Sequence, residues 1–256
     1  MVARAIAQAI LPPLTPFNVG VTALQLGGVV AMGMSERTSP LAYSKFAGAA
    51  GNVPSRLGML IIYALGLVAS IASLISACRE PSCPRAALVG TMLTAHYLKR
   101  ELEVFFVHRY SGKIDLATSC AISLSYGLAT VGIMHYSARE RALGRVAIAG
   151  AVLFGVGAAG NAWHHWLLAA LRSGNRTAYA VPRGALFGLV ACPHYLMELV
   201  AWLGIAMASS SLFAYLNFAS MSAYLMGRAI STRDWYRRKF GDEYPAARKA
   251  LVPYVF

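Results

Sequence analysis

Charged side chains are scarce in this sequence, and acidic ones are the scarcest. Only 13% of the 256 residues are charged and only 10 are Asp or Glu, whereas 57% are hydrophobic and the mean hydropathy is +0.54. A soluble domain averages about 25% charged and about 45–50% apolar residues. This composition excludes a disordered chain and a collagen-like repeat, and four cysteines are too few for a disulfide-built secreted module. It predicts a polytopic membrane protein.

The sequence also lacks the common motifs of metal sites and serine hydrolases. It contains no HExxH and no CxxC, so six histidines give only weak support for zinc, and we predict no metal. It contains no GxSxG, the turn that presents the nucleophile in one large class of hydrolases. Cys78 and Cys83 bracket a short loop, and the sequence leaves open whether they pair or stay free thiols.

One motif of cofactor-binding proteins is present, at Gly155–Gly160, which reads GVGAAG. The dinucleotide fingerprint GxGxxG requires a strand before it and a helix that opens from it. Here the motif lies inside a long apolar segment, where small residues allow neighbouring helices to approach closely. We therefore interpret these glycines as a helix-packing surface.

Seven apolar segments are candidates for helices that cross a bilayer, each of which needs about 20 residues. They are 19–34, 57–77, 86–98, 117–137, 146–171, 185–208 and 209–226. We predict an all-α fold of about seven transmembrane helices, with six or eight as alternatives, in one membrane domain over residues 1–256. The apolar run Ala5–Leu11 stops at Pro12, so we expect a lead-in to the first helix and no cleavable signal peptide.

The basic excess has a topological explanation. The formal net charge is +13, which in a soluble protein would suggest a nucleic-acid partner. If the C-terminal tail is placed in the cytoplasm and the loops alternate, 17 of the 23 Lys and Arg residues lie on the cytoplasmic side and 6 on the other. This split agrees with the positive-inside rule. The charge therefore predicts a cytoplasmic C-terminus and requires no nucleic acid.

Three sets of polar residues lie within or beside the apolar segments, each at spacings that share one helix face. They are His96, Arg100 and Glu103; Asn161, His165 and Arg172; and Tyr195, Glu198 and Trp202. Polar side chains are costly in lipid, so they usually face a cavity or the bundle interior. Interfacial arginines and hydrogen-bonded core residues remain the alternatives for single positions. Because all three sets lie toward the cytoplasmic side, we predict that they share one polar cavity.

The C-terminal segment Thr232–Phe256 is basic, aromatic and amphiphilic. One interpretation is a cytoplasmic amphipathic segment that rests on the anionic leaflet of the membrane. The other is a cover of guanidinium and phenol groups over a phosphate-rich cofactor. The residues alone favour the first.

Several motifs occur in order between residues 96 and 256. They are His96–Gly112, Pro182–Phe187, Cys192–Glu198 with Trp202, Trp235–Phe240, Tyr244-Pro245, Arg248-Lys249 and Val252–Phe256. Over roughly residues 53–256, the sequence resembles the membrane reductase family that contains the steroid 5α-reductases and the trans-2-enoyl-CoA reductases of fatty-acid elongation. The resemblance implies a seven-helix fold that binds NADPH from the cytosolic side and reduces a carbon–carbon double bond conjugated to a carbonyl group.

The resemblance also implies roles for individual residues. Tyr195 corresponds to the proton-donating tyrosine of the enoyl reductases, Glu103 to their motif glutamate, and Tyr97 to the tyrosine that contacts the carbonyl in the steroid enzymes. The residues that it implies around the cofactor are Asn161, His165, Arg172, Tyr179, Glu198, Arg228, Tyr236, Tyr244 and Arg248. Arginine suits the phosphates of NADPH because its planar guanidinium donates in pairs.

The sequence departs from the steroid enzymes at three positions. Their second-span glutamate corresponds to Tyr63, and no acidic residue lies in 57–77; Ala180 and His194 replace an expected arginine and asparagine. These departures favour a trans-2-enoyl-CoA as the substrate. Reduction of a 4-ene-3-keto steroid is the alternative within the family. An isoprenylcysteine-type membrane methyltransferase is a further alternative, because it shares a segment like Phe240–Tyr244.

The resemblance further implies a lipid substrate, and an elongase or another membrane enzyme as partner. It implies the endoplasmic reticulum membrane if the source is a eukaryote, whereas a bacterial source would imply the plasma membrane.

Overall fold

Helices dominate the computed structural model, which describes residues 10–38, 51–79, 82–110, 112–138, 142–172 and 179–256. Seven α-helices lie within these residues: α2 (Pro16–Thr38), α3 (Ser55–Cys78), α4 (Pro84–Leu102), α5 (Leu116–Ser137), α6 (Arg145–Ala170), α7 (Pro193–Ser209) and α8 (Leu212–Phe240). Three short turns are the π-helix η2 (Glu103–Val107) and the 3₁₀ helices η3 (Ala185–Gly188) and η4 (Gly241–Glu243). Two short strands, β1 (Val53–Pro54) and β2 (Lys113–Ile114), pair antiparallel.

The mostly helical class predicted from the sequence is confirmed, but two predicted helix ends are wrong. The segment predicted from 185 becomes the helix α7 only at Pro193. Before Pro193, Gly184 has a φ of 90°, a left-handed backbone conformation that cannot be part of an α-helix. Proline lacks a backbone N–H, so Pro193 is accommodated in the first turn of a helix but not in its interior. The segment predicted to end at 226 continues as α8 to Phe240, because arginine and lysine are good helix formers, and it ends at Gly241.

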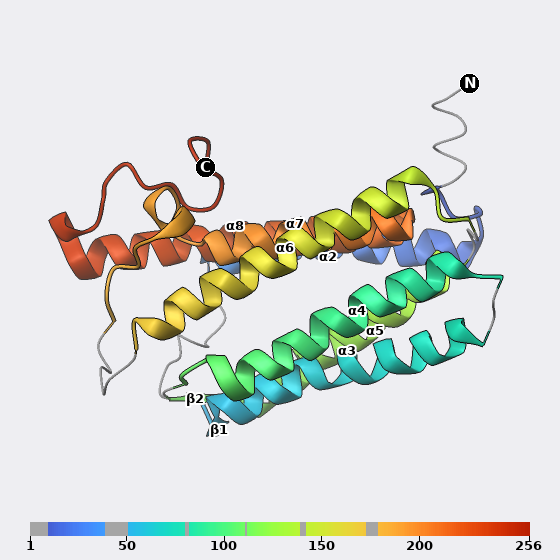
Figure 1. Ribbon diagram of the computed structural model, residues 1–256, viewed down its shortest axis with the longest axis horizontal. Coiled ribbons are helices and arrows are strands. Elements are labelled where there is room, and N and C mark those ends of the chain that lie inside the picture. Colours follow the sequence, from blue (N-terminus) through green and yellow to red (C-terminus); the bar gives the residue numbers. More distant parts are fainter. Residues whose placement is uncertain (1–9, 39–50, 80–81, 111, 139–141, 173–178) are drawn as a thin grey trace.

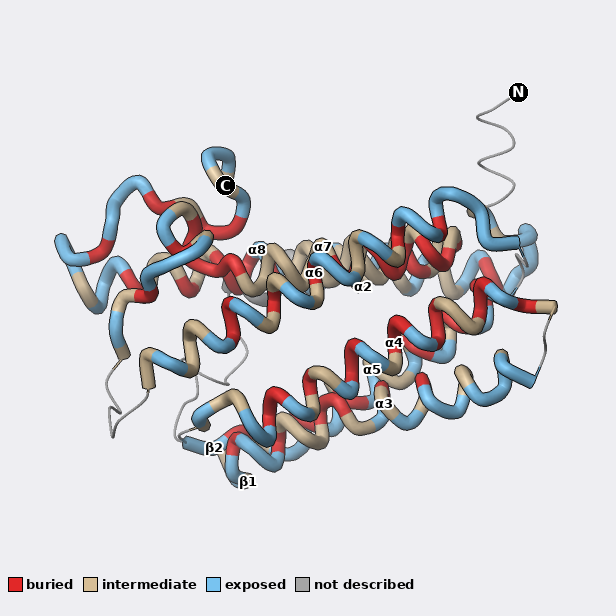
Figure 2. The backbone as a smooth tube through the Cα atoms, viewed as in Figure 1, coloured by how far each residue is buried: buried red, intermediate tan, exposed pale blue. Residues whose placement is uncertain are grey.

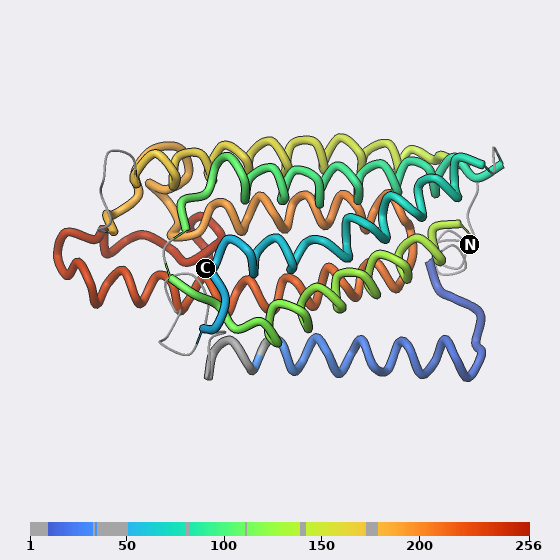
Figure 3. Tube along the Cα trace, turned by 90° about the horizontal axis from the view of Figure 1, so that it is seen from below, coloured from blue at the N-terminus to red at the C-terminus, as the bar shows by residue number. Residues whose placement is uncertain are grey.

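The helices form two layers (Figure 1). One layer contains α2, α6, α7 and α8, and the other contains α3, α4 and α5. Viewed from below, α6 runs beside α7 and α2 beside α8, while α3 lies between α4 and α5 (Figure 3). The largest hydrophobic cluster joins the layers and includes Leu93 and Tyr97 of α4 and Ile205 of α7.

Glycines set the close approach of α6 to α7. A Cβ on Gly150 would lie 2.6 Å from the Gly204 carbonyl oxygen, and a Cβ on Gly157 would collide with the Ala201 backbone. A Cβ on Gly155, in contrast, would meet nothing within 4 Å. The GxGxxG segment therefore lies within a helix, as predicted, and its middle glycine serves the contact with α7.

Among the described helices, α3, α5 and α6 are long and apolar enough to cross a membrane, and α2 contains a shorter apolar stretch, Pro16–Met32. Large apolar side chains such as Val68, Leu128 and Val152 are 63%, 63% and 64% exposed. Exposed and buried positions alternate along these helices (Figure 2). An extensive apolar exterior is what contact with lipid requires. Seven spans and a cytoplasmic C-terminus stay predictions, and most of the predicted lead-in Ala5–Leu11 lies outside the described residues.

The C-terminal tail folds back onto the start of α7. Figure 1 shows α8 extending past its neighbours before the chain turns back toward the bundle. The backbone N–H of Lys249 donates to the Leu189 carbonyl at 2.9 Å, and the N–H of Ala191 donates to the Lys249 carbonyl at 2.8 Å. These bonds fix the tail against the loop that leads into α7.

Cys78 and Cys83, whose pairing the sequence leaves open, lie where α3 ends and α4 begins. Cys78, at the end of α3, and Cys83, before α4, are free thiols.

Candidate active site

A cavity of about 480 Å³ lies between the two layers. All seven described α-helices contribute side chains to its wall. Part of the wall is apolar and includes Met59, Ile122 and Met221, and part is polar and includes Arg100 and Glu198. The volume is in the range of small-molecule sites, about 300–1,000 Å³, and such sites typically combine an apolar wall with a few polar groups.

The polar wall begins at the end of α4 that the sequence predicts to be cytoplasmic. Lys99 Nζ lies 2.7 Å from Glu103 Oε1, and Arg100 Nη1 donates to Glu103 Oε2 at 2.5 Å. The i, i+3 and i, i+4 spacing brings these three side chains to one face. Glu103 is 5% exposed and Arg100 9%. A buried carboxylate is stable only when it is paired, and here two cations pair it.

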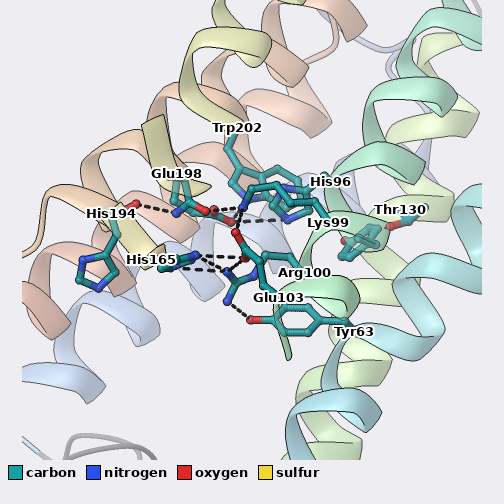
Figure 4. A network of polar contacts seen from close by, with 12 residues as sticks. Tyr63, His96, Lys99, Arg100, Glu103, Thr130, His165, His194, Glu198 and Trp202 are labelled. Carbon is teal, nitrogen blue, oxygen red and sulfur yellow. Dashed lines mark hydrogen bonds and ion pairs between the residues drawn. The ribbon is translucent and has the colours of Figure 1, made fainter. Parts of the chain in front are cut away.

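Helix α6 contributes the next two groups. His165 Nδ1 lies 2.9 Å from Arg100 Nη1 and 3.0 Å from Glu103 Oε2. Asn161, one turn earlier, accepts a 2.5 Å hydrogen bond from Lys99 Nζ. Two of the three polar sets predicted from the sequence therefore meet in one network (Figure 4).

Helix α7 contributes the third set. Asn161 Nδ2 donates to the backbone carbonyl of His194 at 2.8 Å. Glu198 Oε1 accepts a hydrogen bond from Trp202 Nε1 at 3.1 Å and lies 3.5 Å from His96 Nε2. Two polar groups thus link α4 to α7 at the cavity, one through Asn161 and the His194 carbonyl and one through His96 and Glu198 (Figure 4).

Two tyrosines, Tyr63 of α3 and Tyr97 of α4, differ in their position relative to the cavity. Tyr63 lines it, and its hydroxyl accepts a 2.7 Å hydrogen bond from Arg100 Nη2. The Tyr63 ring stacks on Tyr126, with centroids 5.9 Å apart and planes at 10°. Tyr97 is fully buried in the hydrophobic cluster, and its hydroxyl accepts from Thr130 at 3.1 Å. Tyr97 is not among the described lining residues.

A basic and aromatic group lies at another part of the wall. The Arg172 guanidinium lies over the Tyr179 ring, 4.7 Å from its centroid, and donates to the Arg109 carbonyl at 2.7 Å. Lys239 lies over the same ring at 5.5 Å and over Trp235 at 5.2 Å. Cations held over ring faces are oriented by the ring quadrupole. Arg172 and Tyr179 line the cavity, whereas Lys239 and Trp235 are not among its described lining residues.

The folded-back tail adds a buried cation beside two phenols. Tyr236 and Tyr244 stack with centroids 5.6 Å apart, and Arg248 lies over Tyr244 at 4.9 Å. Arg248 Nη1 donates to the Pro182 carbonyl at 3.1 Å. Its Nε is buried and has no hydrogen-bond partner within the part of the chain that the structure describes. Burial raises the pKa of Tyr236 and Tyr244, so both remain neutral hydroxyls near pH 7.

Two groups that follow α4 are held neutral by their surroundings. Burial, helped by the nearby His165 and Arg100, lowers the pKa of His108 to about 2. The rings of His108 and His165 lie 4.7 Å apart. Burial also raises the pKa of Tyr110. The side chains of His108 and Tyr110 both line the cavity, so they face it without charge.

A metal ion is a poor match for this cluster. Glu103, His108 and His165 offer ligand atoms within 4.8 Å of one another. However, the Glu103 oxygens already contact Lys99 Nζ and Arg100 Nη1. A divalent cation there would face two fixed positive charges at close range. The cluster is better explained as an ion-pair network.

The structure brings seven of the predicted site residues to the cavity wall: Tyr195, Asn161, His165, Arg172, Tyr179, Glu198 and Tyr236. Five others are not among the described lining residues: Glu103, Tyr97, Arg228, Tyr244 and Arg248. Glu103 contacts the wall through Arg100, and Arg228 is 1% exposed. The roles that resemblance implies for all twelve stay predictions.

Two other lining residues, Tyr63 and Tyr126, had little in the sequence to mark them as parts of a site. The sequence does contain a signal for Tyr126. Ser119, Ser123, Tyr126 and Thr130 share one face of α5 at i, i+4, i+7 and i+11, and the three hydroxyl residues are buried. For Tyr63 the signal is the resemblance, which sets it at the position of the second-span glutamate of the steroid enzymes, in a helix that lacks acidic residues.

The sequence matches a known protein family and several of its members. A family model described as 3-oxo-5-alpha-steroid 4-dehydrogenase matches residues 115–256. The chain is 33% identical over 166 residues to a very-long-chain enoyl-CoA reductase of Dictyostelium discoideum, which covers 62% of this chain and 55% of that protein. It is 40% identical over 107 residues to the steroid 5-alpha-reductase DET2 of Solanum lycopersicum, which covers 42% of this chain and 41% of that protein.

A longer match is to 3-oxo-5-alpha-steroid 4-dehydrogenase 1 of Rattus norvegicus, 31% identical over 192 residues, 70% of this chain and 71% of that protein. The chain therefore spans about half the length of the first two relatives and over two thirds of the third.

Proposed function

The chain belongs to the 3-oxo-5-alpha-steroid 4-dehydrogenase family, and on that ground we propose that it uses NADPH to reduce a carbon–carbon double bond conjugated to a carbonyl group in a lipid. We propose a trans-2-enoyl-CoA as the substrate. The relatives from Dictyostelium, tomato and rat are named as reductases or dehydrogenases, which supports reduction over the methyl transfer considered from the sequence.

One observation carries the proposal: a cavity with an apolar wall holds a buried cation and two tyrosine side chains. Arg100 contacts the Tyr63 hydroxyl, and Tyr195 lines the same cavity. Reduction of a conjugated enone or enoyl thioester develops negative charge on the carbonyl oxygen. Positive charge and hydrogen-bond donors fixed near that oxygen lower the barrier, because they need no reorganisation during the reaction.

The chemical balance is simple. NADPH supplies a hydride, which is a proton with two electrons, and this forms the new C–H bond at the β-carbon. The electrons of the double bond move toward the carbonyl, and a proton then joins the α-carbon. We propose that the Tyr195 hydroxyl delivers this proton, since a phenol is a neutral donor that water can reprotonate.

The basic residues of the wall and tail fit a phosphate-rich cofactor. Arg248 leaves a buried Nε without a partner within the described residues. Arg172 and Lys239 are held over aromatic rings near the cavity. Guanidinium groups bind phosphate oxygens with paired hydrogen bonds. We propose that Arg172 and Arg248 hold phosphates of NADPH, with Asn161, Tyr179 and the other predicted cofactor residues around them.

We further propose that the enzyme spans the membrane with its C-terminus in the cytoplasm, in the endoplasmic reticulum of a eukaryote or the plasma membrane of a bacterium. The apolar exterior of α3, α5 and α6 supports a membrane location. A lipid substrate dissolved in the bilayer would then reach the cavity from the membrane, and an elongase is a suitable neighbour for an enoyl-CoA reductase.

A second substrate class is favoured by the long match to a steroid dehydrogenase of the rat, which covers 70% of this chain. The alternative reaction is reduction of a 4-ene-3-keto steroid, which has the same conjugated carbonyl. No carboxylate lies along α3, where the steroid enzymes have their second-span glutamate, and this departure favours the enoyl thioester.

One assay tests both substrates. The purified full chain in detergent is incubated with NADPH and a trans-2-enoyl-CoA, and in parallel with a 4-ene-3-keto steroid, while the absorbance of NADPH is followed. We expect oxidation with the enoyl-CoA. Oxidation with the steroid alone would reassign the substrate, and oxidation with neither would contradict the proposed reaction.

A further inference from the structure

We propose that four outward-facing aromatic side chains, Phe105, Phe106, Trp163 and Trp166, bind the headgroup region of the cytoplasmic leaflet and fix the depth of the cavity in the membrane. We call these four residues the aromatic belt. The inference rests on the proposed membrane location and is independent of the proposed reaction. It assigns a lipid interface as the partner of this surface, and it assigns one turn of the bundle to that interface.

The belt is exposed, and its rings lie in pairs. Trp163 and Trp166 of α6 are each 53% exposed, and their rings stack with centroids 5.1 Å apart and planes at 23°. Phe105 and Phe106 of η2 are 53% and 82% exposed, with centroids 6.1 Å apart. Contact of so much aromatic surface with water is unfavourable. We therefore expect a partner to cover it.

The indole groups indicate how deep this surface lies. Within the part of the chain that the structure describes, neither Trp163 nor Trp166 has a hydrogen-bond acceptor for its N–H group. An N–H group without an acceptor is costly in the hydrocarbon core. At the membrane–water interface, the ring contacts acyl chains while the N–H group reaches water or a lipid carbonyl. The interface therefore suits both parts of these side chains.

The length of α6 agrees with this depth. Beyond the belt its outward face is aliphatic, with Val152 and Val156 64% and 58% exposed. The helix begins at the exposed Arg145. From Arg145 to Trp166 it advances 21 residues, or about 32 Å at about 1.5 Å per residue, and the hydrocarbon core is about 30 Å thick. One bilayer thickness thus separates the cation at one end from the indoles at the other.

The belt lies level with the ion pairs inside the bundle. The two indoles flank His165 in the sequence, and the two phenylalanines follow Glu103 by two and three residues. His165 Nδ1 lies 3.0 Å from Glu103 Oε2, so these two segments lie side by side, and Figure 4 shows the contact. The same turn of each segment therefore presents polar groups to the interior and aromatic rings to the exterior.

The membrane boundary then passes through the cavity. Arg172 lines the cavity on the cytoplasmic side of the belt. Ala129 lines it on the other side, because the neighbouring Thr130 contacts Tyr97, which lies almost one turn of α4 farther from the belt than Arg100. A lipid with a charged head and an apolar chain matches this division. The proposed enoyl-CoA is such a lipid, with its nucleotide in the cytoplasm and its chain in the bilayer.

Quenching of fluorescence by brominated lipids measures the depth of the two indoles. The full chain is reconstituted in phosphatidylcholine vesicles whose acyl chains carry bromine either beside the glycerol ester or near the methyl end. The double variant Trp163→Phe/Trp166→Phe gives the background from Trp202 and Trp235, the two other tryptophans of the chain. Each single variant reports the indole that remains. We expect bromine beside the ester to quench the belt indoles more than bromine near the methyl end.

Val156→Trp, made in the double variant, is the matched control. Val156 is 58% exposed on the same helix and lies midway between Arg145 and Trp166. A tryptophan there should lie near the middle of the bilayer. We expect the opposite order of quenching, with bromine near the methyl end the more effective.

The outcomes are separable. Stronger quenching of the belt indoles by bromine near the methyl end would place the boundary beyond the belt and overturn the inference. Quenching of the control but not of the belt would also overturn it, because protein or water would then cover the belt. If neither is quenched, α6 does not face lipid, and the proposed membrane location fails together with the inference. Oxidation of NADPH in detergent tests the proposed reaction separately from all of these.

Discussion

Nε2 of His96 lies 3.5 Å from Oε1 of Glu198, and the same carboxylate oxygen accepts the indole N–H of Trp202 at 3.1 Å. This contact joins α4 of one layer to α7 of the other beside the cavity. Glu198 therefore lines the cavity and also links the two layers. Substitutions that keep or remove its hydrogen-bond acceptor test the link between the layers.

We expect Glu198→Ala to lower the free energy of unfolding by about 1–3 kcal/mol, because it leaves the indole N–H and the imidazole without this acceptor. Glu198→Gln retains an oxygen acceptor for Trp202 and should recover most of the loss. Thermal unfolding of both variants in detergent measures the difference. Equal destabilisation by Ala and Gln would show that the charge, and not the acceptor, holds α7.

Removal of the proposed proton donor should separate binding from turnover. We expect Tyr195→Phe to lower kcat at least about 10²-fold, the scale of general acid catalysis, while the Kd for NADPH changes less than about threefold. Steady-state NADPH oxidation and the fluorescence of bound NADPH measure the two quantities. Turnover equal to that of the wild type would remove Tyr195 from the catalytic role.

The buried tail arginine should control cofactor affinity. We expect Arg248→Gln to weaken NADPH binding about tenfold or more, because a paired phosphate contact is lost. Arg238→Gln is the matched control, since Arg238 is exposed near the end of α8. Fluorescence titration with NADPH and with NADH tests whether the lost contact is to the 2′-phosphate, which NADH lacks. Equal affinities of the two variants would contradict a cofactor role for Arg248.

The two glycines Gly155 and Gly157 distinguish helix packing from dinucleotide binding. We expect Gly157→Ala to lower the free energy of unfolding by about 1–3 kcal/mol, since its Cβ would collide with the Ala201 backbone. Gly155→Ala should be neutral or stabilising, because its Cβ meets nothing within 4 Å and alanine favours the helix. Melting temperatures measure this contrast. A loss of NADPH affinity in both variants, at unchanged stability, would instead indicate a dinucleotide fingerprint.

The buried His108 predicts a dependence of stability on pH. Its pKa is about 2 in the folded protein, below its ordinary value of 6.5. The unfolded chain therefore binds the extra proton below about pH 6.5 and the folded chain does not. This contribution to stability is complete above about pH 6.5 and declines as the pH falls, by at most about 1.4 kcal/mol per pH unit.

We expect His108→Gln to lose less stability than the wild type between about pH 7 and about pH 5, the range in which an ordinary histidine titrates. Thermal unfolding in detergent at several pH values gives the two slopes. Parallel slopes would show that His108 is protonated in both states or in neither.

Much of the site was within reach of the sequence. Helical spacing places His96, Arg100 and Glu103 on one face, and the polar residues within or beside apolar segments mark all three sets. Their meeting at one cavity follows from a simple constraint: such groups avoid lipid, so in a helical bundle they converge. The helix-packing interpretation of Gly155–Gly160 was also within reach, because no strand precedes it.

Other features depended on contacts between distant segments. The sequence predicted α7 to begin at 185, but the turn at Gly184 and the pairing of Lys249 with the loop before Pro193 delay it. Resemblance assigned the carbonyl contact to Tyr97, yet the fit of Tyr97 against Gly66 keeps it out of the described wall. No local pattern reveals either contact.

By itself, the sequence determined the environment of this protein and the faces of its helices, because the scarcity of charge and the 3.6-residue period act within each segment. Only the tertiary structure decided which hydroxyl stands beside Arg100. That choice depends on the packing of α3 against α4, where the absence of a side chain at Gly66 admits the Tyr97 ring and leaves Tyr63 at the cavity. Packing of this kind is a property of two surfaces together, and neither helix encodes it alone.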